Sequence, residues 1–394
     1  MKKKKQIRRM ALAMAVCTGL LLTGCNEEKT SQSAEEEREE QSFRESEKLA
    51  EGFRDIYEAA LKEDRLDTPE TAGQIVDFLG QQGYTAVDAG NRVDMVNAGN
   101  LKNFFQKVTE GETGETSFFV VTASGGFTRY DLQTSAEERE VFQSALNWED
   151  GTPQAAYGEY WPMEGWVLTE NWLFFSRTRP AGYDGPPGDM AIRLEPLEEE
   201  CRSACRQYLE PLGYGRNNLF FTDWTEENLD AVCLEDLYEP FYRMKYGEET
   251  KYGFDFDMTE YAVPGAELES LYQSFFRVTA ETLRERMEWR EDTGTYAYRP
   301  RGIDERPASD YPFPEVTDVR ENPDGTRTLQ VQAVWPEQKT EHAFRHELTV
   351  RPLEDGFQYV ANRVLETGEG MDFSWYTRRL PAEIWKERYG GNTK

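Results

Sequence analysis

The periodicity of apolar residues changes twice from helical to strand-like along this chain. Helical spacing dominates residues 49–108 and strand alternation follows over residues 116–194; helical spacing returns over residues 197–289, and strands follow over residues 316–365. Helices and strands that are grouped in this way pack as helices against antiparallel sheets, whereas a doubly wound parallel sheet needs the two to alternate. The sequence therefore predicts an α+β fold of antiparallel sheets with segregated helices.

The C-terminal region carries the clearest strand pattern. The turn residues Asn322-Pro323-Asp324-Gly325 separate the first two of four short apolar runs. Strands are predicted at residues 316–321, 328–335, 343–351 and 357–365. Their short connections favour a four-strand antiparallel meander.

The pattern in the middle of the chain is weaker. A strand is favoured over residues 142–148, although Ser135 and Glu138 alternatively fit a helix-capping box. A further strand is expected at residues 218–222. Residues 225–246 are expected to form a helix that is interrupted near Pro240, because proline cannot donate to the helical hydrogen-bond ladder.

The N-terminus has the organisation of an export signal. Six of the first nine residues are basic, and the uncharged run Ala11–Leu22 follows. Twelve residues are too few to span a bilayer, which takes about 20 helical residues, but they suit the apolar region of a signal peptide. A plain secretory signal and a short signal anchor both fit this region. The residues that follow favour a third interpretation.

The residues that close the apolar run are Leu22, Thr23, Gly24 and Cys25. An apolar residue, two small residues and a cysteine resemble the lipobox of bacterial lipoproteins. The resemblance implies that residues 1–24 are a signal peptide, that the Cys25 thiol is lipidated, and that Cys25 becomes the first residue of the mature protein. We therefore expect a cell-membrane protein, lipid-anchored through Cys25 and facing the extracytoplasmic side.

Three further segments are expected after the signal peptide. Residues 25–48 are polar and acidic, which is typical of an extended tether, although a charged helix is an equal alternative for residues 34–42. Residues 49–212 are expected to form an N-terminal α+β subdomain. Residues 213–394 are expected to form a C-terminal α+β subdomain.

The charge of the chain restricts its partners. It has 45 basic and 74 acidic residues, a net charge of −29, which becomes −35 when residues 1–24 are removed. Nucleic acid is excluded as a partner, because phosphate binding needs an excess of lysine and arginine. Neutral glycans, cationic peptides and divalent cations remain.

Cysteine and histidine are too sparse for a recognisable metal site. Cys201 and Cys205 lie on one apolar helix stripe, which favours buried thiols, although a disulfide from either of them to Cys233 is an alternative. His342 and His346 lie on a predicted strand, about 13 Å apart at ~3.3 Å per residue, which is too far to share an ion. We expect no metal, no cofactor and no identifiable catalytic residue.

Aromatic residues crowd the segment from Trp148 to Trp172. Tryptophan faces stack on sugar rings and carboxylates accept from sugar hydroxyls, so Trp161, Trp166 and Trp172 are candidate ligand-binding residues for a neutral glycan. The alternative is that these side chains form the core of a sheet, where tryptophan also gathers. Their exposure in the structure decides between the two.

Several short stretches carry a resemblance that covers most of the mature chain. They are YTAVD (84–88), GGFTRYDL (125–132), WEDGTP (148–153), GYDGPPG (182–188), YRPRG (298–302), HELTVRPLEDGFQYVANR (346–363) and the terminal WKERYG. The chain resembles a family of uncharacterised lipoproteins from anaerobic Gram-positive bacteria of the Clostridia type. The resemblance implies location and architecture, and it brings no activity.

These observations favour a membrane-anchored extracytoplasmic lipoprotein that acts as a non-catalytic surface or binding component. The alternative is a secreted carboxylate-dependent hydrolase acting on glycan or peptide, because acids are abundant. Asp255 and Asp257 form one conspicuous acidic pair, which we interpret as solvated surface. The sequence leaves the oligomeric state open.

Overall fold

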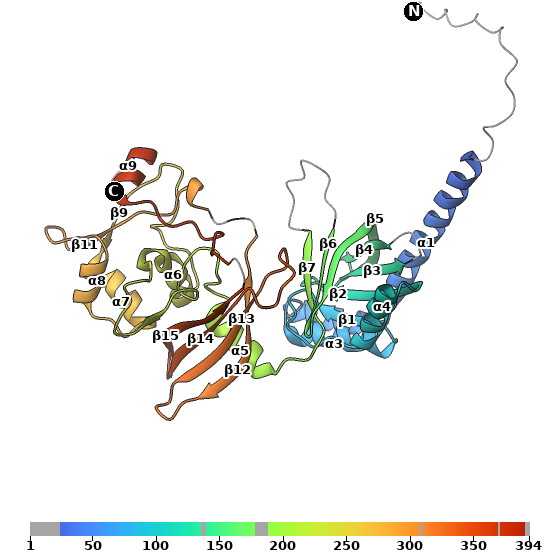
Figure 1. The fold of residues 1–394 in the computed structure, drawn as a ribbon, viewed down its shortest axis with the longest axis horizontal. Coiled ribbons are helices and arrows are strands. Elements are labelled where there is room, and N and C mark those ends of the chain that lie inside the picture. Colours follow the sequence, from blue (N-terminus) through green and yellow to red (C-terminus); the bar gives the residue numbers. More distant parts are fainter. Residues whose placement is uncertain are drawn as a thin grey trace, which may run out of the picture.

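The computed structural model describes residues 24–134, 139–177, 188–306, 308, 310–368 and 371–390, with side chains from residue 35 onwards except at residues 139, 163, 164 and 303. The chain forms two bodies that meet along one side (Figure 1). Each body combines an antiparallel or mostly antiparallel sheet with its own helices. The predicted α+β class is confirmed.

The N-terminal body is a seven-stranded sheet with helices on both faces. The strands lie in chain order, β1 pairs parallel with β2, and every other pairing is antiparallel. The elements are α1 (Gly24–Gly52), α2 (Arg54–Lys62), α3 (Pro69–Gln81), β1 (Thr85–Asp88), α4 (Ala98–Glu110), β2 (Gly114–Val121), β3 (Phe127–Thr134), β4 (Arg139–Glu149), β5 (Thr152–Leu168), β6 (Trp172–Arg177) and β7 (Asp189–Arg193). The strand favoured at residues 142–148 is confirmed as part of β4.

Alternation along β2 divides the core of this body into two layers. Phe118 packs with the apolar face of α4, whereas Phe119, on the opposite side of the strand, packs with α3 and the end of α1. Successive strand side chains point to opposite faces, so neighbouring phenylalanines enter different layers. Helix α3 begins at a proline, and its N-cap residue Thr68 accepts a hydrogen bond from the Thr71 amide at 3.2 Å.

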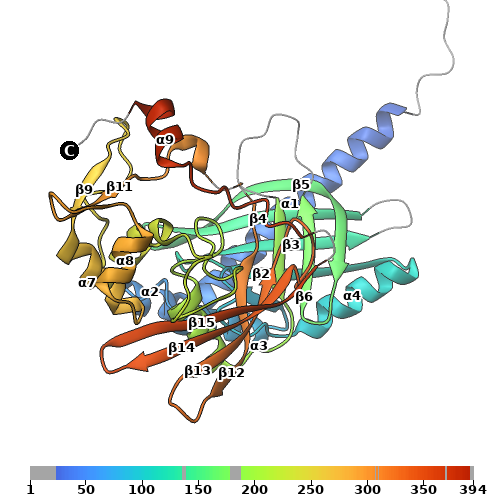
Figure 2. The ribbon, with the colours of Figure 1, turned by 60° about the vertical axis from the view of Figure 1, so that its left-hand side comes forward.

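Residues 25–48 belong to α1 and form no extended tether, and over residues 34–42 the alternative of a charged helix is the one that holds. The helix lies against β4 and β5, and its first turns project away from the body (Figure 1, Figure 2). The buried Arg129 of β3 holds it in place through Glu45 at 3.0 Å and the carbonyl oxygen of Ser42 at 3.2 Å. Helix α1 buries a narrow stripe that includes Ser42, Ser46 and Ala50. Most of its surface faces solvent and is acidic, so the composition of the segment does not indicate a packed helix.

The C-terminal body contains a five-stranded antiparallel sheet in the order β12-β13-β14-β15-β8 and a small sheet in the order β10-β11-β9. The predicted four-strand meander is confirmed, with β8 added at its edge. The elements are α5 (Glu199–Ala204), the π-helical turn η1 (Cys205–Leu209), β8 (Trp224–Thr225), the 3₁₀ turn η2 (Leu234–Leu237), α6 (Tyr238–Tyr246), β9 (Tyr261–Pro264), α7 (Gly265–Phe275), α8 (Ala280–Arg286), β10 (Trp289–Arg290), β11 (Thr295–Tyr298), η3 (Ile303–Glu305), β12 (Phe313–Glu321), β13 (Arg327–Val334), β14 (Phe344–Leu353), β15 (Gly356–Thr367) and α9 (Ala382–Tyr389).

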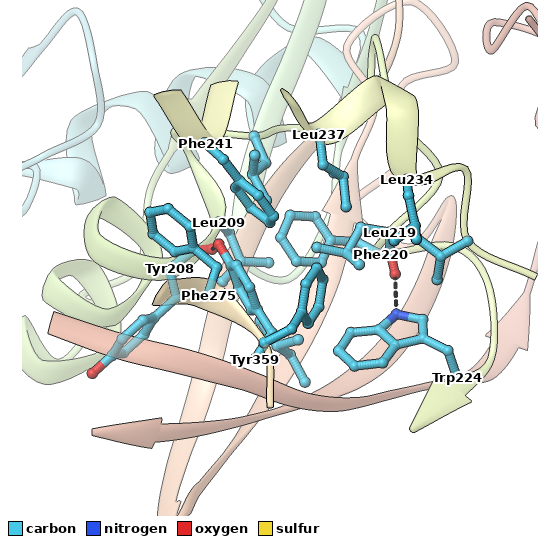
Figure 3. Packing of buried hydrophobic residues seen from close by; sticks show 14 of the residues in the cluster. Tyr208, Leu209, Leu219, Phe220, Trp224, Leu234, Leu237, Phe241, Phe275 and Tyr359 are labelled. Atoms are coloured by element: carbon cyan, nitrogen blue, oxygen red, sulfur yellow. Dashed lines mark hydrogen bonds between the residues drawn. The ribbon is translucent and has the colours of Figure 1, made fainter. Parts of the chain in front are cut away.

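An aromatic core joins these helices to the sheet (Figure 3). Phe241 of α6 stacks on Phe275 of α7 with ring centroids 4.4 Å apart. The Tyr359 hydroxyl donates to the carbonyl oxygen of Tyr208 at 2.7 Å, which ties β15 to η1. Trp224 donates its indole N–H to a backbone carbonyl at 2.7 Å, so this buried ring keeps a polar partner.

The boundary between the bodies lies near residues 194–198, before α5, and the predicted division between residues 212 and 213 is wrong. Helix α5 packs on β12, and the Cys205 thiol lies 3.2 Å from the carbonyl oxygen of Pro314. The apolar stripe of residues 197–212 therefore belongs to the C-terminal core. Periodicity shows which face of a helix is buried, but it does not show which sheet covers that face.

The segment before α6 also differs from the prediction. Residues 218–222 form turns and residues 226–233 are irregular, so neither the expected strand nor the first half of the expected helix forms. The Asn218 side chain donates to the carbonyl oxygen of Ala231 at 2.8 Å and accepts from the Cys233 amide at 2.9 Å. Such side-chain bonds to the backbone replace the hydrogen bonds of regular structure.

The two bodies meet through a small apolar cluster and a buried ion pair. Trp172 and Phe174 of β6 pack against Val334 of β13. Next to them, Arg193 of β7 pairs with Glu315 of β12, and both side chains are almost fully buried. These contacts join strands β6 and β7, at one edge of the N-terminal sheet, to strands β12 and β13, at one edge of the five-stranded C-terminal sheet.

Candidate functional site

A cleft of about 700 Å³ opens in the C-terminal body between residues 210–217, α6 and the segment 298–306. Its lining includes five arginines and four acids, although the whole chain has 74 acidic and 45 basic residues. We call it the arginine cleft. Pockets with convergent polar groups are the usual places for ligands to bind.

A larger cavity, of about 880 Å³, lies where the two bodies meet. The arginines that line it are engaged by carboxylates: Arg202 pairs with Asp94 at 2.5 Å, and Arg92 pairs with Asp88 at 2.7 Å. A ligand there has to compete with these pairs. The arginine cleft is the better candidate because some of its cations have no such partner.

The floor of the arginine cleft is built on Asp236, whose side chain is fully buried. Arg301 binds this carboxylate in a bidentate manner, at 2.8 Å and 2.6 Å. Arg379 and the Tyr376 hydroxyl donate to it at 2.6 Å and 2.7 Å. Burial by itself raises the pKa of Asp236, but Arg379 and Arg301 outweigh burial and hold the pKa below its ordinary value. Two arginines therefore share one carboxylate.

Glu305 also belongs to the floor of the arginine cleft, where it binds backbone amides. Its buried carboxylate accepts from the Gly302 amide at 2.9 Å and from the Leu380 amide at 2.8 Å. Gly302 has no room for a side chain, because a Cβ atom there would overlap Tyr389 of α9. The segment 298–302 and the C-terminal segment are thus fixed together as one rigid surface.

The mouth of the cleft carries the charges that are open to a ligand. Within the described part of the chain, the guanidinium groups of Arg216 and Arg306 have no hydrogen-bond or ion-pair partner. Arg243, in the last turn of α6, pairs with Glu249 at 2.7 Å, but both side chains are more than half exposed. Exposed pairs of this kind contribute little and exchange readily with other anions.

Aromatic and acidic groups complete the mouth. Phe254 and Tyr311 line the cleft with side chains that are 39% and 40% exposed. The Tyr311 ring packs directly on Gly215, where a Cβ atom would lie 2.7 Å from the ring and would require the ring to shift. Glu210 lies at the rim, where partial burial raises the pKa of its carboxyl group.

A comparison with models of protein families identifies the family to which this chain belongs. A model described as a family of unknown function, DUF6070, matches residues 39–379, which is most of the chain and includes all the residues that line the cleft. The chain belongs to the DUF6070 family. No curated protein matches this DUF6070 member, and no solved structure matches it.

The DUF6070 chain buries two of its three candidate tryptophans. Trp161 is 4% exposed and Trp172 is 1% exposed, so neither offers a face to a sugar ring, and the prediction of a glycan platform is wrong for both. Trp166 is half-buried against Phe105, with ring centroids 4.9 Å apart. The three side chains do not converge: Trp161 and Trp166 join the core beside α4, and Trp172 joins the interface between the bodies.

The lipobox lies at the limit of the described residues. Leu22 and Thr23 fall outside them, and Gly24 and Cys25 begin α1. No helix in the described ranges is long and apolar enough to cross a membrane.

The remaining titratable residues that the sequence singled out are structural. Cys201 and Cys205 are buried free thiols, as favoured, and Cys233 is free as well. His346 is fully buried and bonds to Tyr214 at 2.9 Å and to Asn362 at 2.6 Å. Asp255 accepts from Thr259 in its own loop and from Tyr261 at the start of β9. Among the described residues, no group of histidine, cysteine, aspartate and glutamate side chains is arranged to hold a metal ion.

Sequence reasoning missed the arginine cleft because its residues are far apart in the chain. Asp236, Arg301 and Arg379 are separated by 65 and 78 residues, and only the fold brings them together. One signal was present: the stretch YRPRG places Arg299 and Arg301 beside Gly302 in an acidic chain. This stretch is part of the resemblance to a known family, but it does not show where the two arginines lie in the folded protein.

Proposed function

We propose that this DUF6070 protein is a lipid-anchored binding protein on the extracytoplasmic side of the membrane, and that its arginine cleft takes a small organic anion. The lipobox Leu22-Thr23-Gly24-Cys25 supports the anchor. The cationic lining of the cleft within an acidic chain carries the binding function. All the residues that line the cleft lie within the residues matched by the family model.

The preference for an anion follows from the uncompensated cations. Arg301 and Arg379 share the single carboxylate of Asp236, and Arg216 and Arg306 at the mouth have no partner among the described residues. Guanidinium groups bind carboxylate and phosphate through paired N–H donors. A ligand with one carboxylate or phosphate gains hydrogen bonds from Arg216 and Arg306, and it displaces no internal ion pair.

The net charge of the whole chain limits the size of this anion. A mature charge of −35 repels polyanions at long range, but salt screens that repulsion beyond about 8–10 Å. A small monoanion that reaches the cleft meets a local excess of arginine. Phe254 and Tyr311 add faces for an apolar or planar portion, so this ligand class replaces the neutral glycan that the tryptophan cluster favoured.

The competing function, a carboxylate-dependent hydrolase, receives less support from the same cleft. Such an enzyme needs two carboxyl groups that are free to exchange protons, about 5–10 Å apart. Asp236 and Glu305 are engaged by arginine and backbone donors, and Glu239 accepts from the Tyr298 hydroxyl at 2.8 Å. Of the described acids that line the cleft, Glu210 alone has no hydrogen bond or ion pair.

Metabolic labelling tests the anchor. Cells that express the full chain are given an alkynyl palmitate analogue, and we expect wild-type protein and Cys233→Ser to take up the label and Cys25→Ser to take up none. Absence of label on the wild type, or label retained by Cys25→Ser, contradicts lipidation at Cys25.

Titration calorimetry tests the cleft. Benzoate carries a carboxylate on a planar ring, and benzamide is its neutral counterpart. We expect benzoate to bind, benzamide to bind at least tenfold more weakly, and Arg216→Gln/Arg306→Gln to lose at least tenfold for benzoate alone. Arg277→Gln removes an exposed arginine outside the cleft and serves as the control. Equal binding of the two compounds, or no binding of either, rejects an anion site.

A further inference from the structure

A second, largely apolar pocket adjoins the arginine cleft. It has a volume of about 520 Å³ and lies between α6, the end of α7 and the turn that joins β14 to β15. Met244, Phe275 and Phe357 supply its apolar walls. This volume lies within the range of about 300–1,000 Å³ that ligand pockets occupy.

Three residues line both cavities: Pro211, Pro240 and Arg243. The two cavities are therefore neighbours, separated only by the side chains at this boundary. Arg243, in the last turn of α6, lies at this boundary, and its guanidinium is held by the exposed Glu249. An anion on Arg243 is adjacent to the charged cleft on one side and to the apolar pocket on the other.

The charges of the apolar pocket favour an anionic ligand over a cationic one. Besides Arg243, its lining contains Lys245, whose ammonium donates to the carbonyl oxygen of Ser270 at 3.2 Å, and the exposed Asp355. Two cations thus accompany one acid in this lining. Like the arginine cleft, the pocket reverses the sign of the chain as a whole.

We propose that the two cavities form one bipartite site for a linear amphiphile, with a carboxylate head on Arg243 at the edge of the arginine cleft and an alkyl chain in the apolar pocket. This inference rests on the proposed function and names its ligand class as a medium-chain carboxylate. Burial of the chain against Met244, Phe275 and Phe357 supplies binding energy that a short carboxylate lacks. The head group selects against neutral amphiphiles of the same length.

Calorimetric titration of the full mature chain with butanoate, octanoate and octan-1-ol tests this arrangement. We expect octanoate to bind at least tenfold more tightly than butanoate, because each buried methylene adds about a fourfold gain. We expect octan-1-ol to bind at least tenfold more weakly than octanoate. Arg243→Gln is expected to remove the difference between octanoate and octan-1-ol.

Two variants at Met244 test the apolar half. Met244→Leu keeps an apolar side chain of similar volume, and Met244→Glu places a negative charge in the pocket. We expect Met244→Leu to bind octanoate as the wild type does, and Met244→Glu to bind it at least tenfold more weakly. Circular dichroism of both variants establishes that they are folded, since Met244 is only partly buried.

The outcomes separate this inference from the function on which it rests. If benzoate binds in an Arg216- and Arg306-dependent manner but octanoate binds no better than butanoate, the bipartite site is rejected and the anion cleft stands. If no carboxylate binds, both are rejected. If octan-1-ol binds as tightly as octanoate, the pocket is a general apolar site and the assignment of the head group to Arg243 is wrong.

Discussion

Arg379 donates from Nε to a carboxylate oxygen of Asp236 at 2.6 Å, across 143 residues of chain. The same guanidinium donates from Nη1 to the carbonyl oxygen of Arg299 at 2.5 Å, so one side chain joins the C-terminal segment to η2 and to the segment 298–302. Burial by itself lowers the pKa of Arg379. The nearby Asp236 carboxylate outweighs burial and raises the pKa of Arg379 above its ordinary value. The floor of the arginine cleft depends on this relationship.

Removing one partner of this pair is expected to destabilise the protein strongly. Arg379→Gln leaves the Asp236 carboxylate buried with one arginine, and breaking a buried pair in this way costs about 3–5 kcal/mol. Urea unfolding measures the change in the free energy of unfolding. Arg378→Gln, at the exposed neighbouring position, is the matched control and is expected to change stability by at most about 0.5 kcal/mol. Equal effects of the two variants count against the structural role of Arg379.

The two histidines give a test of pH dependence. Burial lowers the pKa of His346 to about 4, whereas an unfolded histidine titrates near 6.5. Between these values the unfolded chain takes up a proton that the native imidazole does not, so stability falls as the pH drops from about 6.5 towards 4. Chemical unfolding at several pH values is expected to show a shallower decline for His346→Gln than for the wild type.

The exposed His342 is the control for this experiment. His342→Gln is expected to keep the wild-type slope of unfolding free energy against pH, because this side chain is exposed to solvent rather than buried in the core. His346→Gln lowers stability at every pH by losing its bonds to Tyr214 and Asn362, so the slope is the diagnostic quantity. A slope that His346→Gln leaves unchanged contradicts the assignment.

Tryptophan truncation tests whether the aromatic segment is core. Trp172 is 1% exposed and packs on Phe313 with ring centroids 5.6 Å apart, so Trp172→Ala is expected to cost about 3–5 kcal/mol. Phe256 is 91% exposed, and Phe256→Ala is expected to change stability by at most about 0.5 kcal/mol. Thermal melts measure both. A Trp172→Ala protein with an unchanged melting temperature is incompatible with this packing.

The free thiols give a chemical test of burial. Burial raises the pKa of Cys201 to about 11 and raises that of Cys205 further, so both are poor nucleophiles at neutral pH. We expect a maleimide to label neither in the native protein and both in denaturant without reductant, as read by peptide mass spectrometry. Resistance in denaturant until reductant is added instead demonstrates a disulfide.

The sequence predicted the elements better than their partners. The strands of the meander and the helical character of residues 49–108 follow from periodicity, since the spacing of apolar residues fixes which side chains share a face. The stripe of residues 197–212 was equally clear, yet it was assigned to the wrong body. Its partner is β12, more than 100 residues later, and no local pattern specifies such a partner.

By itself the sequence determined the α+β class, the C-terminal meander and the burial of the Cys201 and Cys205 thiols, because these depend on residue spacing within one or two elements. Only the tertiary structure decided that Trp161 and Trp172 are core, that residues 25–48 form a helix, and that Asp236, Arg301 and Arg379 meet. A charge or an aromatic ring has no fixed role in the chain alone. Its solvation and its pKa are set by neighbours that folding brings from distant segments.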